Sequence, residues 1–200
     1  MTANLIRAGN AATKLLLAQR LYSLRIDVTR LAYDRKIIFD SMQHFCAVTQ
    51  TTISRLADGS DCLKDGCTFI RRFAGENFYV VLYNGTAANT ARRGFTLAHE
   101  VGHIYLAHQE DGDLQEREAN HFAAQLLAPE ILVHALVQRV RGPVTPEDLC
   151  QTFAVSRQAA ENRIRSLARF PHPRFSREDL QLLKKTEHLL PDAGKPLVDI

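Results

Sequence analysis

The chain has 200 residues, of which 46% are hydrophobic and 24% are charged, and its 25 basic and 22 acidic side chains leave a net charge of +3. This composition is typical of a folded soluble protein and excludes a disordered, collagen-like or coiled-coil chain. A charge excess this small gives no reason by itself to expect a nucleic acid partner. The excess lies entirely in residues 139–200.

The first 84 residues combine helical patterns with short β-prone runs. Apolar residues at helical spacing open the chain, and a weaker helical pattern follows and leads into a short strand. From residue 46 onward, short apolar runs alternate with turn dipeptides such as Asn84-Gly85, a pattern typical of strands. The predicted elements are helices over 11–24 and 29–39 and strands over 36–40, 68–73 and 78–83.

Helical patterns dominate the rest of the chain. Pro129 stops one helix, and Thr145-Pro146-Glu147-Asp148 has the form of a capped helix start. The predicted helices span 95–108, 114–128, a segment from 145, 156–169 and 177–189. We therefore expect an α+β fold in which helices frame a small sheet. The expected division is a core over residues 1–142 and a helical extension over 143–200 that packs on it.

The cysteines and the apolar runs indicate a cytoplasmic protein. No apolar run approaches the roughly 18 residues of a membrane span. The N-terminal residues also lack the continuous apolar stretch and the cleavage site of a secretory signal. In a reducing compartment the four cysteines are expected to remain free thiols. They are Cys46, Cys62, Cys67 and Cys150.

The sequence His99-Glu100-Val101-Gly102-His103 lies in a predicted helix and has the HExxH pattern of zinc peptidases. Two histidines four residues apart lie about 40° apart around a helix, so both imidazoles can reach one ion. Glu100 projects near the same edge, where it can take a proton from a metal-bound water. The alternative is a helix that carries two unrelated histidines.

A catalytic zinc ion usually has three protein ligands and one open position, so a third ligand is expected. A histidine six residues after His103 is excluded, because Gln109 stands there. Two carboxylates remain in the next helix. Glu118 lies at the edge of the apolar stripe, where zinc would offset the cost of burying a carboxylate, whereas Glu116 points about 160° away into solvent. This favours Glu118, and the alternative is a partly exposed glutamate without such a role.

Two longer stretches surround these residues. They are RRGFTLAHEVGH at residues 92–103 and EREANHFAAQLLAP at residues 116–129. Together they resemble the ImmA/IrrE family of metallopeptidases, which is marked by RFTxAHExGH and then ExEANxFAxxLLxP. The resemblance implies a zincin-like fold with Zn²⁺ held by His99, His103 and Glu118. Glu100 would be the general base. Departures from the family pattern, at positions not expected to touch the metal, are Gly94 and Ala128.

The resemblance further implies a zinc-dependent metalloendopeptidase that acts as a regulatory protease in the cytoplasm. Members of the family cleave helix-turn-helix repressors or antitoxins, so a protein substrate of this kind is the expected partner, as in phage or mobile-element systems. Zinc would polarise the scissile carbonyl and lower the pKa of its water. Glu100 would take that proton and pass it to the leaving amine.

The sequence does not decide which residues stabilise the oxyanion or orient the two histidines. The candidates for stabilising the oxyanion are Tyr105, His108, His121 and Arg92. The candidates for orienting the two histidines through hydrogen bonds are Asn120, Asp111 and Asp113, for which packing or solvation is the simpler role.

Two short helices in residues 145–167, with Ser156 at the N-cap of the second, predict a helix-turn-helix arrangement. DNA recognition would need several basic side chains on one face, but Arg163 does not share the face of Arg165 and Arg169. We therefore expect these helices to pack against the core rather than bind DNA. The alternative function is a non-catalytic regulator that binds a repressor or DNA through them.

Overall fold

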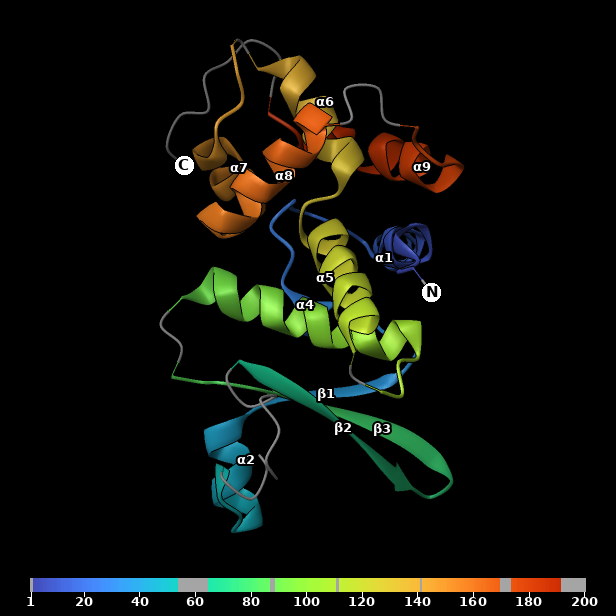
Figure 1. Cartoon of the computed structure of the whole chain (residues 1–200), viewed down its shortest axis with the longest axis vertical. Coiled ribbons are helices and arrows are strands. Elements are labelled where there is room, and N and C mark those ends of the chain that lie inside the picture. Colours follow the sequence, from blue (N-terminus) through green and yellow to red (C-terminus); the bar gives the residue numbers. More distant parts are fainter. Residues whose placement is uncertain are drawn as a thin grey trace.

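A small sheet lies toward one end of the molecule, with most of the helices stacked on one of its faces and α2 (Met42–Thr49) on the other, as the computed structural model in Figure 1 shows. The described residues are 2–53, 65–86, 89–110, 112–140, 142–169 and 174–191. Within these ranges, no helix combines the length and the apolar character that crossing a membrane requires. The arrangement confirms the predicted α+β fold class.

In the described residues the sheet consists of β1 (Lys36–Ser41), β2 (Gly66–Phe73) and β3 (Glu76–Tyr83), in the order β1-β3-β2. The central strand β3 runs parallel to β1 and antiparallel to β2. Ala74 and Gly75 join β2 to β3 and both have positive φ angles, as a two-residue hairpin turn that matches the strand twist requires. The structure confirms the strands predicted at 36–40, 68–73 and 78–83.

Helix α4 (Thr90–Leu106) lies across one face of the sheet, and α5 (Asp113–Leu127) crosses α4 on the side away from the strands (Figure 1). The crossing is close because Gly102 has no side chain. A Cβ atom at residue 102 would lie 3.2 Å from the Cα of Ala119 and 3.1 Å from the Cδ1 of Phe122. This contact brings the first turns of α5 over the HExxH residues of α4.

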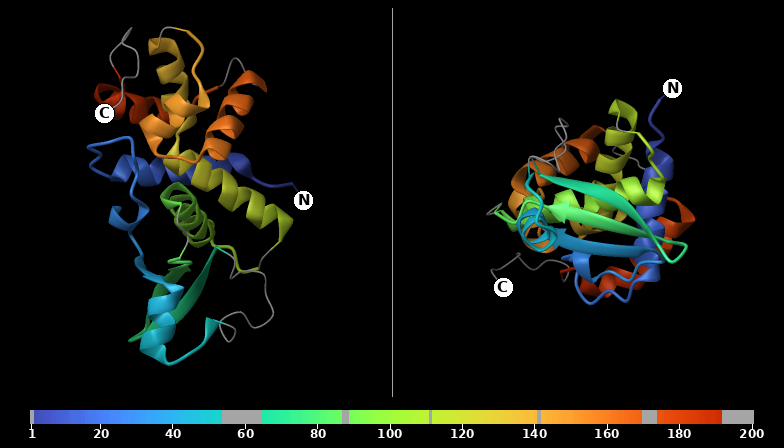
Figure 2. Two further views of the ribbon diagram at one scale, coloured as in Figure 1. Left: turned by 90° about the vertical axis from the view of Figure 1, so that its left-hand side faces the viewer. Right: turned by 90° about the horizontal axis from the view of Figure 1, so that it is seen from below.

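Helix α1 (Leu5–Ala18) lies between this helix pair and the C-terminal helices (Figure 2). Leu149, Phe153 and Leu182 from the C-terminal helices are buried in the same hydrophobic cluster as residues of α4 and α5. The C-terminal elements are α6 (Glu130–Arg139), α7 (Pro146–Phe153), α8 (Arg157–Arg169), α9 (Arg177–Thr186) and the short 3-10 helix η3 (Glu187–Leu189). The division of the chain at residue 142 stays a prediction.

The predicted helix starts in the C-terminal part have the expected caps. Thr145 and Asp148 form a reciprocal capping box at the start of α7. The Ser156 hydroxyl accepts a hydrogen bond from the backbone N–H of Ala159 at the start of α8. Helices α7 and α8 pack against each other, as the helix-turn-helix pattern predicts.

The sequence prediction lacks one helix near the sheet and misplaces two segments near the N-terminus. The missing helix, α2 (Met42–Thr49), covers the outer face of the sheet, and its eight residues are too few to show a clear helical period. Residues 29–39 do not form the predicted helix. They contain the end of the 3-10 turn η1 (Val28–Arg30) and the beginning of β1 instead. Helix α1 starts six residues earlier than predicted, where the Asn4 side chain caps it.

A second missing helix, α6, follows α5 directly. Pro129 ends α5 as predicted but also stands immediately before α6, where the absence of a backbone N–H costs no helical hydrogen bond.

Cys46 and Cys150 are free thiols as expected, and Cys62 lies outside the described residues.

Candidate metal centre

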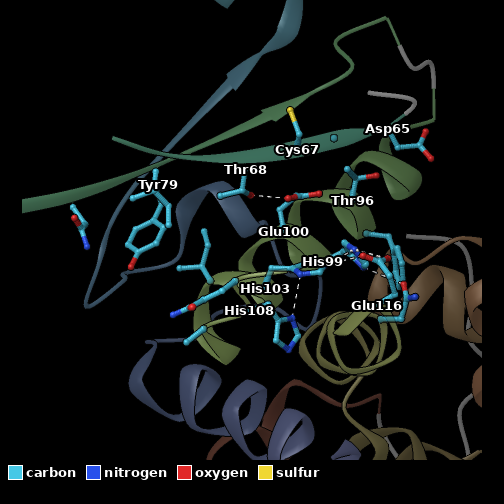
Figure 3. A pocket seen from close by; sticks show the side chains of 18 residues that line it. Asp65, Cys67, Thr68, Tyr79, Thr96, His99, Glu100, His103, His108 and Glu116 are labelled. Carbon is cyan, nitrogen blue, oxygen red and sulfur yellow. Dashed lines mark hydrogen bonds and ion pairs between the residues drawn. The ribbon is translucent and has the colours of Figure 1, made fainter. Parts of the chain in front are cut away.

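Both histidines of the HExxH sequence face a glutamate of the next helix (Figure 3). The Nε2 atoms of His99 and His103 on α4 lie 3.0 Å apart. The two carboxylate oxygens of Glu116 on α5 lie 3.3 Å from one Nε2 atom each. Ligand atoms of all three side chains lie within 4.8 Å of one another, so this group could hold a metal ion. Two imidazoles and a carboxylate are a common ligand set of catalytic zinc.

The protonation state of His103 is compatible with binding a metal cation. Burial, followed by the neighbouring rings of His99 and His108, lowers the pKa of His103 to about 4. The ring is therefore neutral at pH 7 and keeps a lone pair on one nitrogen. A lone pair that faces a carboxylate oxygen at 3.3 Å repels it unless a proton or a metal ion lies between them. Glu116 keeps 46% of its side chain exposed, which leaves this side of the group open to solvent.

A hydrogen bond from α5 fixes the outer side of the first histidine. The Oδ1 atom of Asn120 lies 3.1 Å from the Nδ1 atom of His99. If Nδ1 carries the proton and donates to this amide oxygen, Nε2 has its lone pair directed at Glu116. Glu116 and Asn120 are four residues apart and therefore share one face of α5. Asn120 thus has the orienting position that the sequence offered as one option.

A cavity of ≈980 Å³ lies between α4 and strand β2, and the three side chains line it. Glu100 lines the same cavity, on the side of β2 (Figure 3). The Thr68 hydroxyl on β2 donates a 2.6 Å hydrogen bond to Oε2 of Glu100. Such a bond stabilises the charged carboxylate and restricts its orientation.

Strand β2 reaches Glu100 because it comes very close to α4 at Gly66. A Cβ atom at residue 66 would lie 2.5 Å from the Cγ2 of Thr96 and 3.1 Å from the carbonyl oxygen of Leu82. Any side chain here would therefore separate the strand from the helix. The glycine thus sets the distance between Thr68, two residues along the strand, and the carboxylate of Glu100.

The structure brings Glu116, not the predicted Glu118, to the two histidines. The Oε1 atom of Glu118 accepts a 2.6 Å hydrogen bond from the backbone N–H of Asn4, and Oε2 lies 3.2 Å from Nε2 of His108. The Asn4 N–H is the main cause of the lowered pKa of Glu118. The physical reason is the crossing of α4 and α5: the inward edge of α5 at residue 118 meets the N-terminal segment and the end of α4. The opposite flank, which carries Glu116, lies over the histidines.

The comparison with known families agrees with this site. A family model described as the IrrE N-terminal-like domain of peptidase family M78 matches residues 64–165, half of the chain. The chain belongs to this family. The matched range contains β2, β3, α4 and α5, and with them all residues of the candidate centre. The M78 domain confirms the family that the sequence resembles and supports a metallopeptidase type of function. No curated protein matches the chain.

Of the four residues of this M78 domain predicted as candidates for stabilising the oxyanion, only His108 lines the metal-centre cavity. The Tyr105 hydroxyl donates to Asp34, outside the cavity, and His121 lines a second cavity with residues of α1 and α9. Arg92 is largely exposed and pairs with Asp65 at 2.7 Å. The ring of His108 is already engaged, because both of its nitrogens lie within hydrogen-bond distance of protein partners.

The candidates for orienting the two histidines are Asn120, Asp111 and Asp113. Asn120 lies beside His99, whereas Asp113 is exposed and Asp111 lies outside the described residues.

Two cavity residues of the M78 domain were not found by sequence reasoning. Thr68 holds Glu100, and Tyr79 lines the cavity from the central strand. Both face α4, like Val81, which is paired with Thr68 across the two strands. Alternation along the strands could have placed them on one face. It could not have shown that this face meets the HExxH helix, since that depends on the packing of α4 on the sheet.

Proposed function

We propose that the protein is a zinc-dependent metalloendopeptidase in which His99, His103 and Glu116 hold the metal ion. The observation that carries this proposal is the convergence of the three ligand atoms at the wall of a cavity that Glu100 also lines. The donor set fits zinc, because a His₂Glu set leaves a fourth position for water or substrate. Glu116 takes the place that the sequence prediction gave to Glu118.

Zinc held by His99, His103 and Glu116 would supply a Lewis acid for the scissile carbonyl and for the attacking water. Glu100, which lines the same cavity, would serve as the group that takes a proton from that water and returns it to the leaving amine. The hydroxyl of Thr68 donates a hydrogen bond to the Glu100 carboxylate and restricts its orientation in the cavity. Asn120 keeps the Nε2 lone pair of His99 directed at the metal position.

A peptide in extended conformation is the substrate class that the cavity favours. Strand β2 lines the cavity and, within the described residues, pairs only with β3, so its other edge can pair with an added strand. Ile70 and Tyr79 add apolar surface to the cavity wall. By the resemblance of the sequence, the protein substrate is a helix-turn-helix repressor or antitoxin, cleaved in the cytoplasm as a regulatory step.

The test compares the wild-type protein with Glu100→Gln. Elemental analysis should give about one zinc per chain for both proteins, because Glu100 is not a ligand in the proposal. Cleavage of casein, and of a purified helix-turn-helix repressor, should occur only with the wild type. A wild type that binds no zinc overturns the proposal, and so does a Glu100→Gln protein that cleaves at the wild-type rate.

The alternative is a non-catalytic regulator that acts through α7 and α8. Its support is a stripe of exposed polar side chains on α8, formed by Gln158, Asn162 and Arg165. The Glu100→Gln protein separates the two functions. A regulatory effect that persists in this variant favours the binding role, and an effect that disappears favours cleavage.

A further inference from the structure

The second histidine of the centre has an outer partner of a different kind from the first. The Nδ1 atom of His103 lies 3.1 Å from Nδ1 of His108, and Nε2 of His108 lies 3.2 Å from Oε2 of Glu118. The backbone N–H of Asn4 donates to the other oxygen of Glu118. These side chains are largely shielded from solvent, with 13% of His103, 7% of His108 and 13% of Glu118 exposed. A partly buried carboxylate is thus connected to the metal-facing ring through one intervening imidazole.

Local structure places His108 against His103. Helix α4 ends at Leu106, and the capping residue Ala107, with a positive φ of 55°, reverses the chain. The backbone N–H of His108 then donates to the carbonyl of His103. The two rings meet edge to face with their centroids 4.9 Å apart. Glu118 reaches His108 from α5, and Asn4 at the start of α1 donates to Glu118. We call the hydrogen-bonded series His103, His108, Glu118 and Asn4 the row. Three separate helices therefore contribute to this arrangement.

The hydrogen bonds of the row have one consistent direction when the rings are neutral. With the lone pair of His103 Nε2 directed at the metal position, its single proton is on Nδ1 and is donated to Nδ1 of His108. The proton of His108 must then be on Nε2, where it is donated to the Glu118 carboxylate. Each contact has one donor and one acceptor. The first histidine differs, because its Nδ1 atom faces the neutral amide oxygen of Asn120.

We propose that Glu118 and His108 form a positioning pair that acts on the metal through His103. The negative charge of Glu118 polarises His108, and His108 in turn fixes the tautomer and the ring plane of His103 and strengthens it as a ligand. Glu118 thus contributes to metal binding without touching the metal. The inference rests on the proposed metal ligands His99, His103 and Glu116.

The test is the zinc affinity of the full chain, measured by competition with a chromophoric chelator. His108→Leu removes both hydrogen bonds and should weaken zinc binding about 10- to 100-fold. His108→Gln should restore much of the affinity, since its amide can accept from His103 and donate to Glu118. Glu118→Gln keeps an acceptor but loses the charge, and should lie between these two. The control His188→Leu changes an exposed histidine and should bind zinc like the wild type.

The absorption spectrum of the cobalt-substituted protein adds a readout that loss of packing alone does not change. Its d–d bands should shift in His108→Leu and return toward the wild-type position in His108→Gln. Equal zinc affinities and equal cobalt spectra for the wild type, His108→Leu and Glu118→Gln overturn the inference, while the proposed function stands. A wild type without zinc overturns the proposed function itself. If His108→Leu does not fold, the Glu118→Gln and His108→Gln proteins decide the question by the same two measurements.

Discussion

The α4–α5 pair and the α7–α8 pair differ in the direction of their polar side chains. Where α4 and α5 cross, His99, His103 and Glu116 face one another across the contact. In α7 and α8, Leu149, Phe153 and Ala160 are buried. The polar side chains of Gln158 and Asn162 on α8 lie exposed and bond to each other. The first pair can concentrate donor atoms on one point, which metal chemistry requires. The second pair presents the polar side chains of Gln158 and Asn162 to solvent instead.

The largest expected effect concerns the third ligand at the α4–α5 crossing. Glu116→Gln should abolish stoichiometric zinc retention and all zinc-dependent cleavage, because only two strong ligands remain. Glu118→Gln should keep zinc at lower affinity. Elemental analysis after gel filtration measures both proteins. The opposite result, with zinc kept in Glu116→Gln and lost in Glu118→Gln, would return the ligand role to the residue that the sequence predicted.

The choice between these two glutamates marks the limit of sequence prediction for this molecule. The HExxH histidines are four residues apart in one helix, so their convergence is a local property and can be predicted. The stripe of α5 that contains Ala119 and Phe122 is also buried as expected. Which flank of the stripe faces the histidines depends on the angle at which α5 crosses α4, and no local pattern contains that angle. The row from His103 to Glu118 was missed for the same reason.

In the rest of the fold, too, features set by local sequence can be predicted, whereas features set by packing cannot. Short β-prone runs bounded by turn residues predict β2 and β3, whereas the helical period of the short α2 is too weak to be recognised. Pro129 was interpreted only as a helix end, although it also begins α6. The contact of Thr68 with Glu100 depends on the close approach at Gly66, which is visible only in the packed structure.

A second prediction tests the closeness of the α4–α5 crossing with two identical substitutions in one helix. Gly102→Ala places a Cβ against the backbone of Ala119, whereas Gly94→Ala meets nothing within 4 Å. Both gain helix propensity, so Gly94→Ala should stabilise the protein by up to about 1 kcal/mol. Gly102→Ala should be less stable than Gly94→Ala by about 1–3 kcal/mol. Urea unfolding measures the difference, and equal stabilities would mean that the helices can separate without cost.

A third prediction concerns His121, which lies on α5 away from the metal centre. Burial, followed by the charge of Arg163, lowers its pKa to about 4 from 6.5. Between these values the unfolded chain binds a proton that the folded protein does not. The metal-free protein should therefore lose stability as the pH falls from about 6.5 to about 4, by about 1–3 kcal/mol for this residue.

The change His121→Gln should remove this part of the loss. His103 contributes in the same direction, so the dependence on pH is reduced rather than abolished. Urea unfolding of the metal-free proteins at several pH values measures it, with the exposed His188→Gln as the control. An unchanged pH dependence in His121→Gln would show that the buried ring titrates normally in the folded state.

The smallest effects are expected on the exposed face of α8. Arg165 and Arg169 are exposed, whereas Arg163 is buried, with 7% exposed, and cannot join them on a groove-facing surface. Two cations with an overall charge of +3 give little attraction to DNA. The double change Arg165→Ala and Arg169→Ala should therefore leave casein cleavage unchanged and stability within about 0.5 kcal/mol. DNA binding that falls steeply with salt in the wild type, and is lost in the double variant, would instead make α8 a nucleic acid surface and give the α7–α8 pair a function of its own.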